Sequence, residues 1–379
     1  MFLITCSAPA APSARSIKEL ALPVLLVEFI VIGLAVVERP KADWKLNAVW
    51  VSLAGLVAIA WVTAITAPQP VAGMIRTALW MIHLAFGISI SHLARREPSL
   101  PEDMPKALMV GFLGLTLLFV IFAAIVNRPD YDWITNIPAY GNIRWFGYFA
   151  AVAIALSAPG VERGRKLAFV ACTLAFAIAF WTGSRGALAS TLIGIAGAAL
   201  FFPTLRRFAF WGRFGAGFSF GLLLSLGLDA AFPIQGAARI VSEASGIMGG
   251  SGRVELWFAT LQNIALRPWF GWGEGQVGFM SGRELGVGHP HNFILQVVHA
   301  WGLAGAALLI LPAAWLARLV LRPPDPRALS LNCAVIVLAA FSMIDGTLFH
   351  VHSLAIFAAC VGILGAQKNG EGRRDEAAA

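Results

Sequence analysis

Residues 107–126 read ALMVGFLGLTLLFVIFAAIV, an apolar stretch that contains no charged side chain. A helix needs about 20 apolar residues to cross the hydrocarbon layer of a bilayer, so this stretch predicts a transmembrane helix. Comparable runs recur along the whole chain. The eleven runs that predict membrane-spanning helices are 19–37, 47–66, 71–92, 106–126, 145–159, 166–182, 186–203, 207–228, 292–319, 329–345 and 350–366.

The composition agrees with a helical membrane protein. Hydrophobic residues make up 58% of the chain and charged residues 13%, whereas soluble domains carry about 25% charged residues. The net charge of +8 does not indicate nucleic-acid binding, because Lys and Arg gather in the cytoplasmic connections of membrane proteins. We therefore expect an all-α polytopic membrane protein with about 11–12 transmembrane helices.

The distribution of Lys and Arg predicts which connections face the cytoplasm. Basic residues cluster in alternate connections, which are expected to be cytoplasmic. This orientation places the N-terminus and one large loop late in the chain on the external, periplasmic side. The predicted organisation is about eight transmembrane helices in 1–228, a periplasmic loop or lid in 229–291, about three transmembrane helices in 292–367 and a cytoplasmic tail in 368–379.

The predicted loop 229–291 is too long to be a simple connector, because loops above about 12–15 residues are usually functional or disordered. Its middle part, Arg253–Ala265, has Val254, Trp257 and Leu261 at helical spacing, and the part that follows is rich in glycine. We expect a folded cap over the membrane domain.

The strongest chemical signal is His289-Pro290-His291-Asn292, where this loop meets the next apolar run. Proline is favoured at the first position of a helix, so His291 and Asn292 are expected in the first turn. A helix N-terminus offers free N–H groups and the positive end of the helix dipole, and both suit a diphosphate. The same field disfavours a protonated imidazole, which makes His291 a candidate general base. His289 either shapes the turn before Pro290 or supports the site.

The helix stripe that starts at His291 continues through Gly302 and Gly305. Small residues at such positions let another helix approach closely. The pattern His291-Asn292, nine residues, Gly302, two residues, Gly305 resembles the signature of the O-antigen ligases, a family of bacterial cell-surface glycosyltransferases. The plan of many helices with one large late external loop resembles that family over nearly the whole chain. The resemblance implies a donor glycan carried on undecaprenyl diphosphate.

Three arginines are candidates for holding the donor: Arg185, between two apolar runs, Arg253, after a Gly/Ser stretch, and Arg144, at the start of a run. A guanidinium is a planar fork that matches phosphate oxygens. The resemblance implies that Arg185 and Arg253 contact the diphosphate or the glycan. The alternatives are a snorkelling side chain for Arg185, a solvated charge for Arg253 and an interfacial anchor for Arg144. Glu255 lies on another face from Arg253 and is a candidate for orienting a sugar.

Asp345 lies near the last external turn and either orients a base, binds a sugar hydroxyl or pairs with an arginine for structure. His299 is expected to be a buried, hydrogen-bonded residue. Arg76 and His83 fall within an apolar run and are expected to pair internally. No phosphate-binding glycine loop and no metal-binding spacing of carboxylates is present, so we expect neither a metal nor a cofactor.

The resulting hypothesis is an O-antigen ligase-type glycosyltransferase of the bacterial inner membrane with its active site facing the periplasm. It moves a glycan from undecaprenyl diphosphate to a hydroxyl of the lipid A core, without a metal and with inversion. An O-antigen or exopolysaccharide polymerase and a protein O-oligosaccharyltransferase are alternatives with the same donor. A transporter of the lipid-linked glycan is less favoured, because few charges interrupt the spans and no repeated half is evident. The expected partners are the bilayer, the donor and a lipid A core or glycan acceptor, and no nucleic acid.

Overall fold

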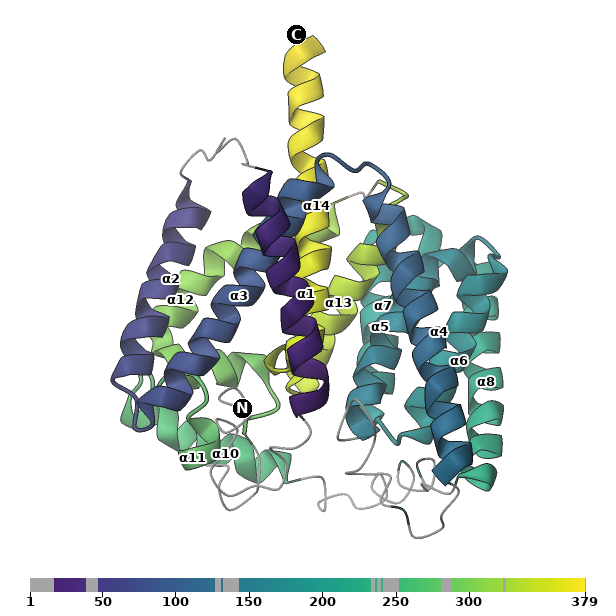
Figure 1. The fold of residues 1–379 in the computed structure, drawn as a ribbon, viewed down its shortest axis with the longest axis horizontal. Coiled ribbons are helices and arrows are strands. Elements are labelled where there is room, and N and C mark those ends of the chain that lie inside the picture. Colours follow the sequence, from purple (N-terminus) through teal and green to yellow (C-terminus); the bar gives the residue numbers. More distant parts are fainter. Residues whose placement is uncertain are drawn as a thin grey trace. The chain divides into compact units, whose positions relative to one another are not determined.

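The computed structural model of the 379-residue chain describes residues 17–38, 47–126, 131, 143–232, 236, 240, 252–280, 288–322 and 325–378, without the side chains of 17–21, 144 and 368–378. Every regular element among these residues is helical (Figure 1). The α-helices are α1 (Ile17–Val37), α2 (Ala48–Ile65), α3 (Pro70–Ala94), α4 (Leu100–Val126), α5 (Ile143–Glu162), α6 (Lys166–Trp181), α7 (Arg185–Phe201), α8 (Phe208–Ala231), α10 (Arg253–Leu266), α11 (Val277–Met280), α12 (Phe293–Leu321), α13 (Leu329–Ile344) and α14 (Val351–Ala378). Two short 3-10 helices are η3 (Pro203–Arg206) and η4 (Thr347–Phe349).

Each of the eleven predicted apolar runs coincides with one of the helices α1 to α8 and α12 to α14. Six helices in the described part of the chain are long and apolar enough to cross a membrane, and the shorter apolar helices account for the other runs. The prediction of an all-α polytopic membrane protein is therefore confirmed. The side of the membrane that each connection faces stays a prediction. Of the predicted external loop, residues 233–235, 237–239, 241–251 and 281–287 lie outside the described part.

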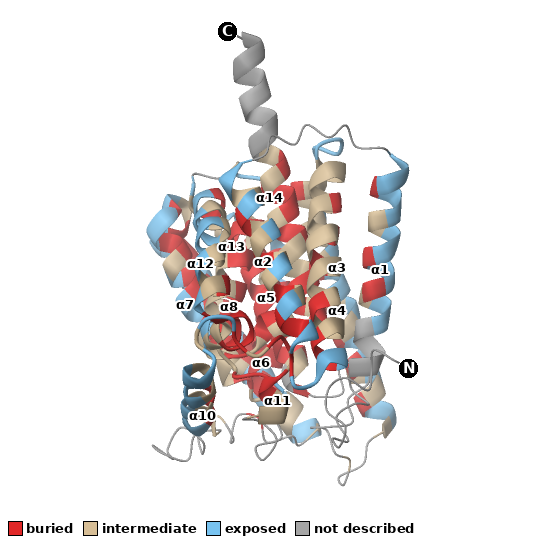
Figure 2. Ribbon diagram, turned by 90° about the vertical axis from the view of Figure 1, so that its left-hand side faces the viewer, coloured by how far each residue is buried: buried red, intermediate tan, exposed pale blue. Residues whose placement is uncertain are grey.

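The helices form two compact units. The first consists of Met1–Leu93, Gly249–Leu319 and Ser342–Gly362, and the second of Ala94–Met248, Val320–Phe341 and Ile363–Ala379. In the second unit, α5 packs against α4, α6, α7 and α8. The span of α5 is 78% buried, and Figure 2 accordingly shows this helix largely in the colour of buried residues. A helix with this little exposed surface is the centre of its unit.

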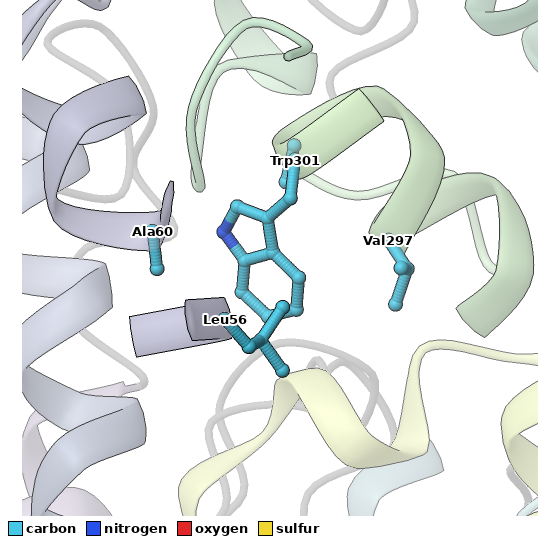
Figure 3. Packing of buried hydrophobic residues seen from close by; sticks show 5 residues of the cluster. Leu56, Ala60, Val297 and Trp301 are labelled. Atoms are coloured by element: carbon cyan, nitrogen blue, oxygen red, sulfur yellow. The ribbon is translucent and has the colours of Figure 1, made fainter. Parts of the chain in front are cut away.

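The first unit holds α12 in place through α2. Their contact is a cluster of buried apolar side chains from both helices (Figure 3). The cluster consists of Leu56, Ala60, Val297, Ala300 and Trp301. The indole of Trp80 on α3 packs edge-on against Trp301, with the ring centroids 5.9 Å apart. The hydroxyl of Ser52 donates to the Leu308 carbonyl over 2.6 Å. These contacts anchor the helix whose first residues follow the His-Pro-His-Asn motif.

Helix α12 is interrupted at Gly302, which has φ 64° and ψ −170°. Only glycine adopts this conformation readily. The break leaves backbone groups of α12 without partners in the helix, and these groups form hydrogen bonds with an irregular segment. The amides of 303–304 donate to the carbonyls of 268–269 over 2.8–3.0 Å. The amides of 272–273 donate to the carbonyls of 299–300 over 2.8–2.9 Å. The expectation that Gly302 admits a neighbouring helix is therefore wrong, because this irregular segment occupies the space.

We expect Gly302→Ala to destabilise the protein by about 1–3 kcal/mol from backbone strain alone. A Cβ at this position would also overlap the Trp269 carbonyl. The measurement is the apparent melting temperature of the detergent-solubilised protein. Gly111→Ala is the matched control, because a Cβ there meets open space on a regular helix. A Gly302→Ala protein that melts together with wild type would show that the break is not required.

Three polar residues of the first unit, His83, Arg76 and His299, were expected to have internal partners, and two of them do. His83 pairs with the buried carboxylate of Glu28, with Nδ1 and Oε1 2.6 Å apart. Arg76 donates to the Phe349 carbonyl over 2.9 Å, so both side chains have the expected internal partners. His299 is buried as expected, but neither of its ring nitrogens has a hydrogen-bond partner among the described residues. The expected hydrogen bond of His299 is therefore wrong.

Candidate active site

The His-Pro-His-Asn motif lies just before α12 rather than inside it. The Asn292 side-chain oxygen accepts the Leu295 N–H over 3.0 Å, and the Asn292 carbonyl accepts the Gln296 N–H over 2.9 Å. This geometry makes Asn292 the N-cap, a position that favours a short polar side chain. His291 precedes the cap with φ 54°. The prediction that Pro290 opens the helix and that His291 and Asn292 lie in its first turn is therefore wrong.

Asp345 lies between His291 and Arg253. One carboxylate oxygen of Asp345 forms a short hydrogen bond with Nδ1 of His291 and accepts the Gly346 N–H over 2.8 Å. The other oxygen accepts from Nη2 of Arg253 over 3.1 Å. The side chain of Asp345 is 10% exposed, that of His291 21% and that of Arg253 28%. The aspartate is therefore mostly enclosed, while its two partners remain accessible.

The surroundings of Asp345 favour its ionised form. Burial raises its pKa, but the hydrogen bond and charge of His291 and the charge of Arg253 outweigh burial and bring the pKa below the ordinary value of 3.8. An ionised carboxylate only accepts hydrogen bonds, so the shared proton of the pair belongs to Nδ1 of His291. In a neutral imidazole, Nε2 is then the nitrogen that can accept a proton.

His289 packs against the back of this arrangement. Its Nδ1 accepts the backbone N–H of His291 over 3.3 Å, and the two imidazole centroids are 4.2 Å apart. Burial and the charge of His291 keep the pKa of His289 well below its ordinary range. Burial has the same effect on the pKa of His350, whose ring lies against that of His289. A Cβ at Gly346 would overlap the His289 ring, so a glycine is required for this packing.

A second polar cluster connects the segment after α10 to the same region. Oε1 of Glu274 accepts from Nε2 of Gln296 on α12 over 2.8 Å. Burial raises the pKa of Glu274, against the opposing charge of Arg76 and hydrogen bonds from Gln296 and Trp80. The guanidinium of Arg76 lies 3.5 Å above the ring of Phe349, which in turn packs on His289. Sequence reasoning missed the roles of Glu274 and Gln296, and the only signal was an arginine inside an apolar run.

His291 and Asp345 border a small pocket with a cavity volume of about 10 Å³. Its wall also includes Asn292, Gln296 and Phe349. The imidazole is partly exposed and is supported by the aspartate. This arrangement has the parts of an acid–base site, namely a base, a carboxylate that orients it and a cation.

Residues 170–310 match the family model described as O-antigen ligase. This match supports the O-antigen ligase and polymerase superfamily for the chain. No curated protein matches the chain. The matched residues include the His-Asn motif, Gly302, Arg185 and Arg253, whereas Asp345 lies beyond them. The match supports a membrane glycosyltransferase of the O-antigen ligase or polymerase type.

The other predicted site residues are Arg144, Arg185, Asn292 and Glu255, and no contact between them and the histidine and aspartate pair carries the site described above. Arg185 is the first residue of α7 and Arg144 the second of α5, and both belong to the second unit. The side chain of Arg144 lies outside the described part. Glu255 is exposed on α10. The amide nitrogen of Asn292 donates to the Met343 carbonyl over 3.1 Å. Contacts of these residues with substrate therefore stay predictions.

Proposed function

We propose that this protein transfers a glycan from undecaprenyl diphosphate to an acceptor hydroxyl, in the manner of an O-antigen ligase acting on the lipid A core. The reaction is assigned to the periplasmic face of the inner membrane, where the donor must be carried by a lipid because nucleotide sugars are cytoplasmic. The observation that carries the proposal is the accessible His291, held through Nδ1 by Asp345, which also binds Arg253. The match of residues 170–310 to the O-antigen ligase model supports the class of reaction.

In the proposed chemistry, Nε2 of His291 takes the proton of the acceptor hydroxyl. The acceptor oxygen forms a bond to the anomeric carbon of the donor glycan from the face opposite the leaving group. The bond between that carbon and the diphosphate oxygen breaks, and undecaprenyl diphosphate leaves with the electron pair. Configuration at the anomeric carbon is inverted. Asp345 stabilises the imidazolium that forms on His291.

The leaving group carries negative charge, so its departure is faster beside a fixed cation. Arg253 is assigned this role, because its guanidinium is partly exposed and oriented by Asp345. The planar fork of a guanidinium still has donors for phosphate oxygens after binding one carboxylate oxygen. Arg185 and Arg144 are proposed as further donor contacts on the sequence argument alone.

The test is transfer by the purified protein in detergent with EDTA, from undecaprenyl-diphosphate glycan to separate acceptors. We expect product on lipid A core with wild type and a loss of about 10²- to 10³-fold with Arg253→Ala, the size typical of one lost charge-stabilising donor. Arg267→Ala is the matched control. It removes an arginine that stacks on Trp272 at 4.1 Å in the segment after α10, instead of the arginine that binds Asp345.

Other products would redirect the assignment. A ladder of longer lipid-linked glycans would identify a polymerase with the same site, and glycosylated protein would identify a protein transferase. Absence of transfer to every acceptor, combined with normal glycan export by the Arg253→Ala protein in cells, would overturn the enzyme proposal and favour transport.

A further inference from the structure

Helix α10 has an outward face that is apolar although the helix is not a membrane span. Val254, Phe258 and Leu261 are 56%, 64% and 48% exposed, and their spacing places them on one stripe of the helix. The exposed polar residues Glu255 and Gln262 border this stripe on one side. Figure 2 shows α10 largely in the colour of exposed residues.

The apolar surface continues beyond the end of α10. Leu266, Trp269 and Phe270 are 72%, 66% and 61% exposed. We call the six side chains Val254, Phe258, Leu261, Leu266, Trp269 and Phe270 the α10 patch. Contiguous apolar patches that contain large aromatic side chains usually mark an interaction site.

The segment that follows the patch lies at the level where α2 ends. The backbone of Gly273 packs against Thr63 and Ala67 at the end of that helix. The side chain of Gln276 bonds to both the N–H and the carbonyl of Gln69, over 3.0 and 3.1 Å, in the turn between α2 and α3. Helix α2 has 18 residues, so its length of about 27 Å nearly matches a hydrocarbon layer of about 30 Å. Its end therefore marks the boundary between membrane and water.

The patch also adjoins surface that faces lipid. The carbonyl of Trp269 accepts the Ala304 N–H over 3.0 Å, so Trp269 and Phe270 lie beside the transmembrane part of α12. Leu303 on that part is 47% exposed, as expected for a lipid-facing leucine. Exposed apolar side chains of the spanning helix and of the α10 patch therefore lie near one another.

We propose that the α10 patch is seated in the bilayer, at the boundary between the headgroups and acyl chains of the leaflet beside His291. An amphipathic helix with a large apolar face and a polar edge lies in this boundary, and tryptophan is favoured there. Glu255 and Gln262 then face the aqueous side. If the proposed function holds, this seating keeps Arg253, the first residue of α10, at the depth of a lipid diphosphate.

The test measures the depth of spin labels on the full-length protein in lipid nanodiscs. Cys6 is replaced by serine, and the buried Cys172, Cys333 and Cys360 remain. Phe258→Cys and Leu261→Cys report on the patch, and Gln262→Cys is the matched control on the neighbouring polar edge. The readout is the collision of each nitroxide with oxygen, which concentrates in hydrocarbon, and with a nickel chelate, which stays in water.

We expect the ratio of oxygen to nickel collisions to be several-fold higher at 258 and 261 than at 262. Equal nickel collisions at 258 and 262 would overturn the proposal by showing that the patch faces water. Low collisions with both reagents at 258 would also overturn it, because another protein surface, such as a second copy of the chain, would then cover the patch. The measurement needs no glycan transfer, so its outcome is independent of the proposed reaction.

Discussion

Replacement of His291 by alanine is expected to lower the rate of glycan transfer by about 10²- to 10⁴-fold, the usual contribution of a positioned general base. His291 is the accessible member of the pair with Asp345, and it borders the pocket with its imidazole supported from behind. Without the imidazole, the acceptor hydroxyl must lose its proton to water. The loss should appear in the turnover rate measured with saturating donor, since alanine leaves Arg253 in place.

The matched control for this prediction is His92→Ala. His92 lies in the last turn of α3, where it is 3.9 Å from Glu38, so its removal tests the general effect of losing a histidine. We expect near wild-type transfer from this control. A His291→Ala protein that transfers glycan as fast as the His92→Ala protein would remove the general base from the mechanism.

Asp345→Asn is expected to reduce transfer by a similar factor, about 10²- to 10⁴-fold. An amide that donates its N–H to Nδ1 of His291 forces the imidazole proton onto Nε2, and that nitrogen then cannot accept the proton of the acceptor. Asparagine also removes the charge that stabilises the imidazolium and orients Arg253. The size of the side chain is unchanged, so the variant separates charge from packing. The measurement is the pH–rate profile together with the turnover rate.

Asp325→Asn is the control for the Asp345 prediction, because Asp325 also pairs with an arginine, Arg327, over 2.9 Å. It belongs to a connection without predicted site residues, and we expect normal transfer. If Asp345→Asn gave the wild-type rate and the wild-type pH profile, the aspartate would be only a structural partner of Arg253.

The lowered pKa of Asp345 also predicts how the stability of the folded chain depends on pH. Its pKa is below the ordinary value of 3.8 in the folded chain, so folding is favoured by its ionised form. The stabilisation is complete at pH values above 3.8 and is lost as the pH falls below that value. The difference in melting temperature between wild type and Asp345→Asn should therefore shrink as the pH falls from about 5 into stronger acid.

The helices were predictable because each depends on a local property. An apolar run such as 106–126 is long enough to cross a bilayer whatever its neighbours are, and each of the eleven runs became a helix. The same holds for the helix at Arg253, where Val254 and Leu261 show the helical period. The outward position of these two residues was not predictable, because periodicity identifies a face without its partner.

Part of the candidate site was also visible in the pattern of residues. The motif around His291 was recognised from residue types and spacing, and Arg253 from the resemblance to the O-antigen ligases. Asp345 was a candidate with three alternative roles, of which orienting a base was one. The start of α12 was misplaced, because the capping bond from Asn292 to Leu295 competes with the preference for proline at the first helical position. The break at Gly302 was missed, because a glycine in an apolar run has the same appearance in a continuous helix.

The sequence alone therefore determined a polytopic helical membrane protein with a His-Asn motif at the entry of one helix, since hydropathy and spacing act over a few turns of chain. The tertiary structure decided that Asp345 supports His291 and binds Arg253, and that Glu274 reaches Gln296 next to that site. These partners come from separate stretches of the chain, and their hydrogen bonds require a specific approach of packed helices. The distance and orientation between these helices depend on how many buried side chains pack together, and a local sequence pattern does not contain this information.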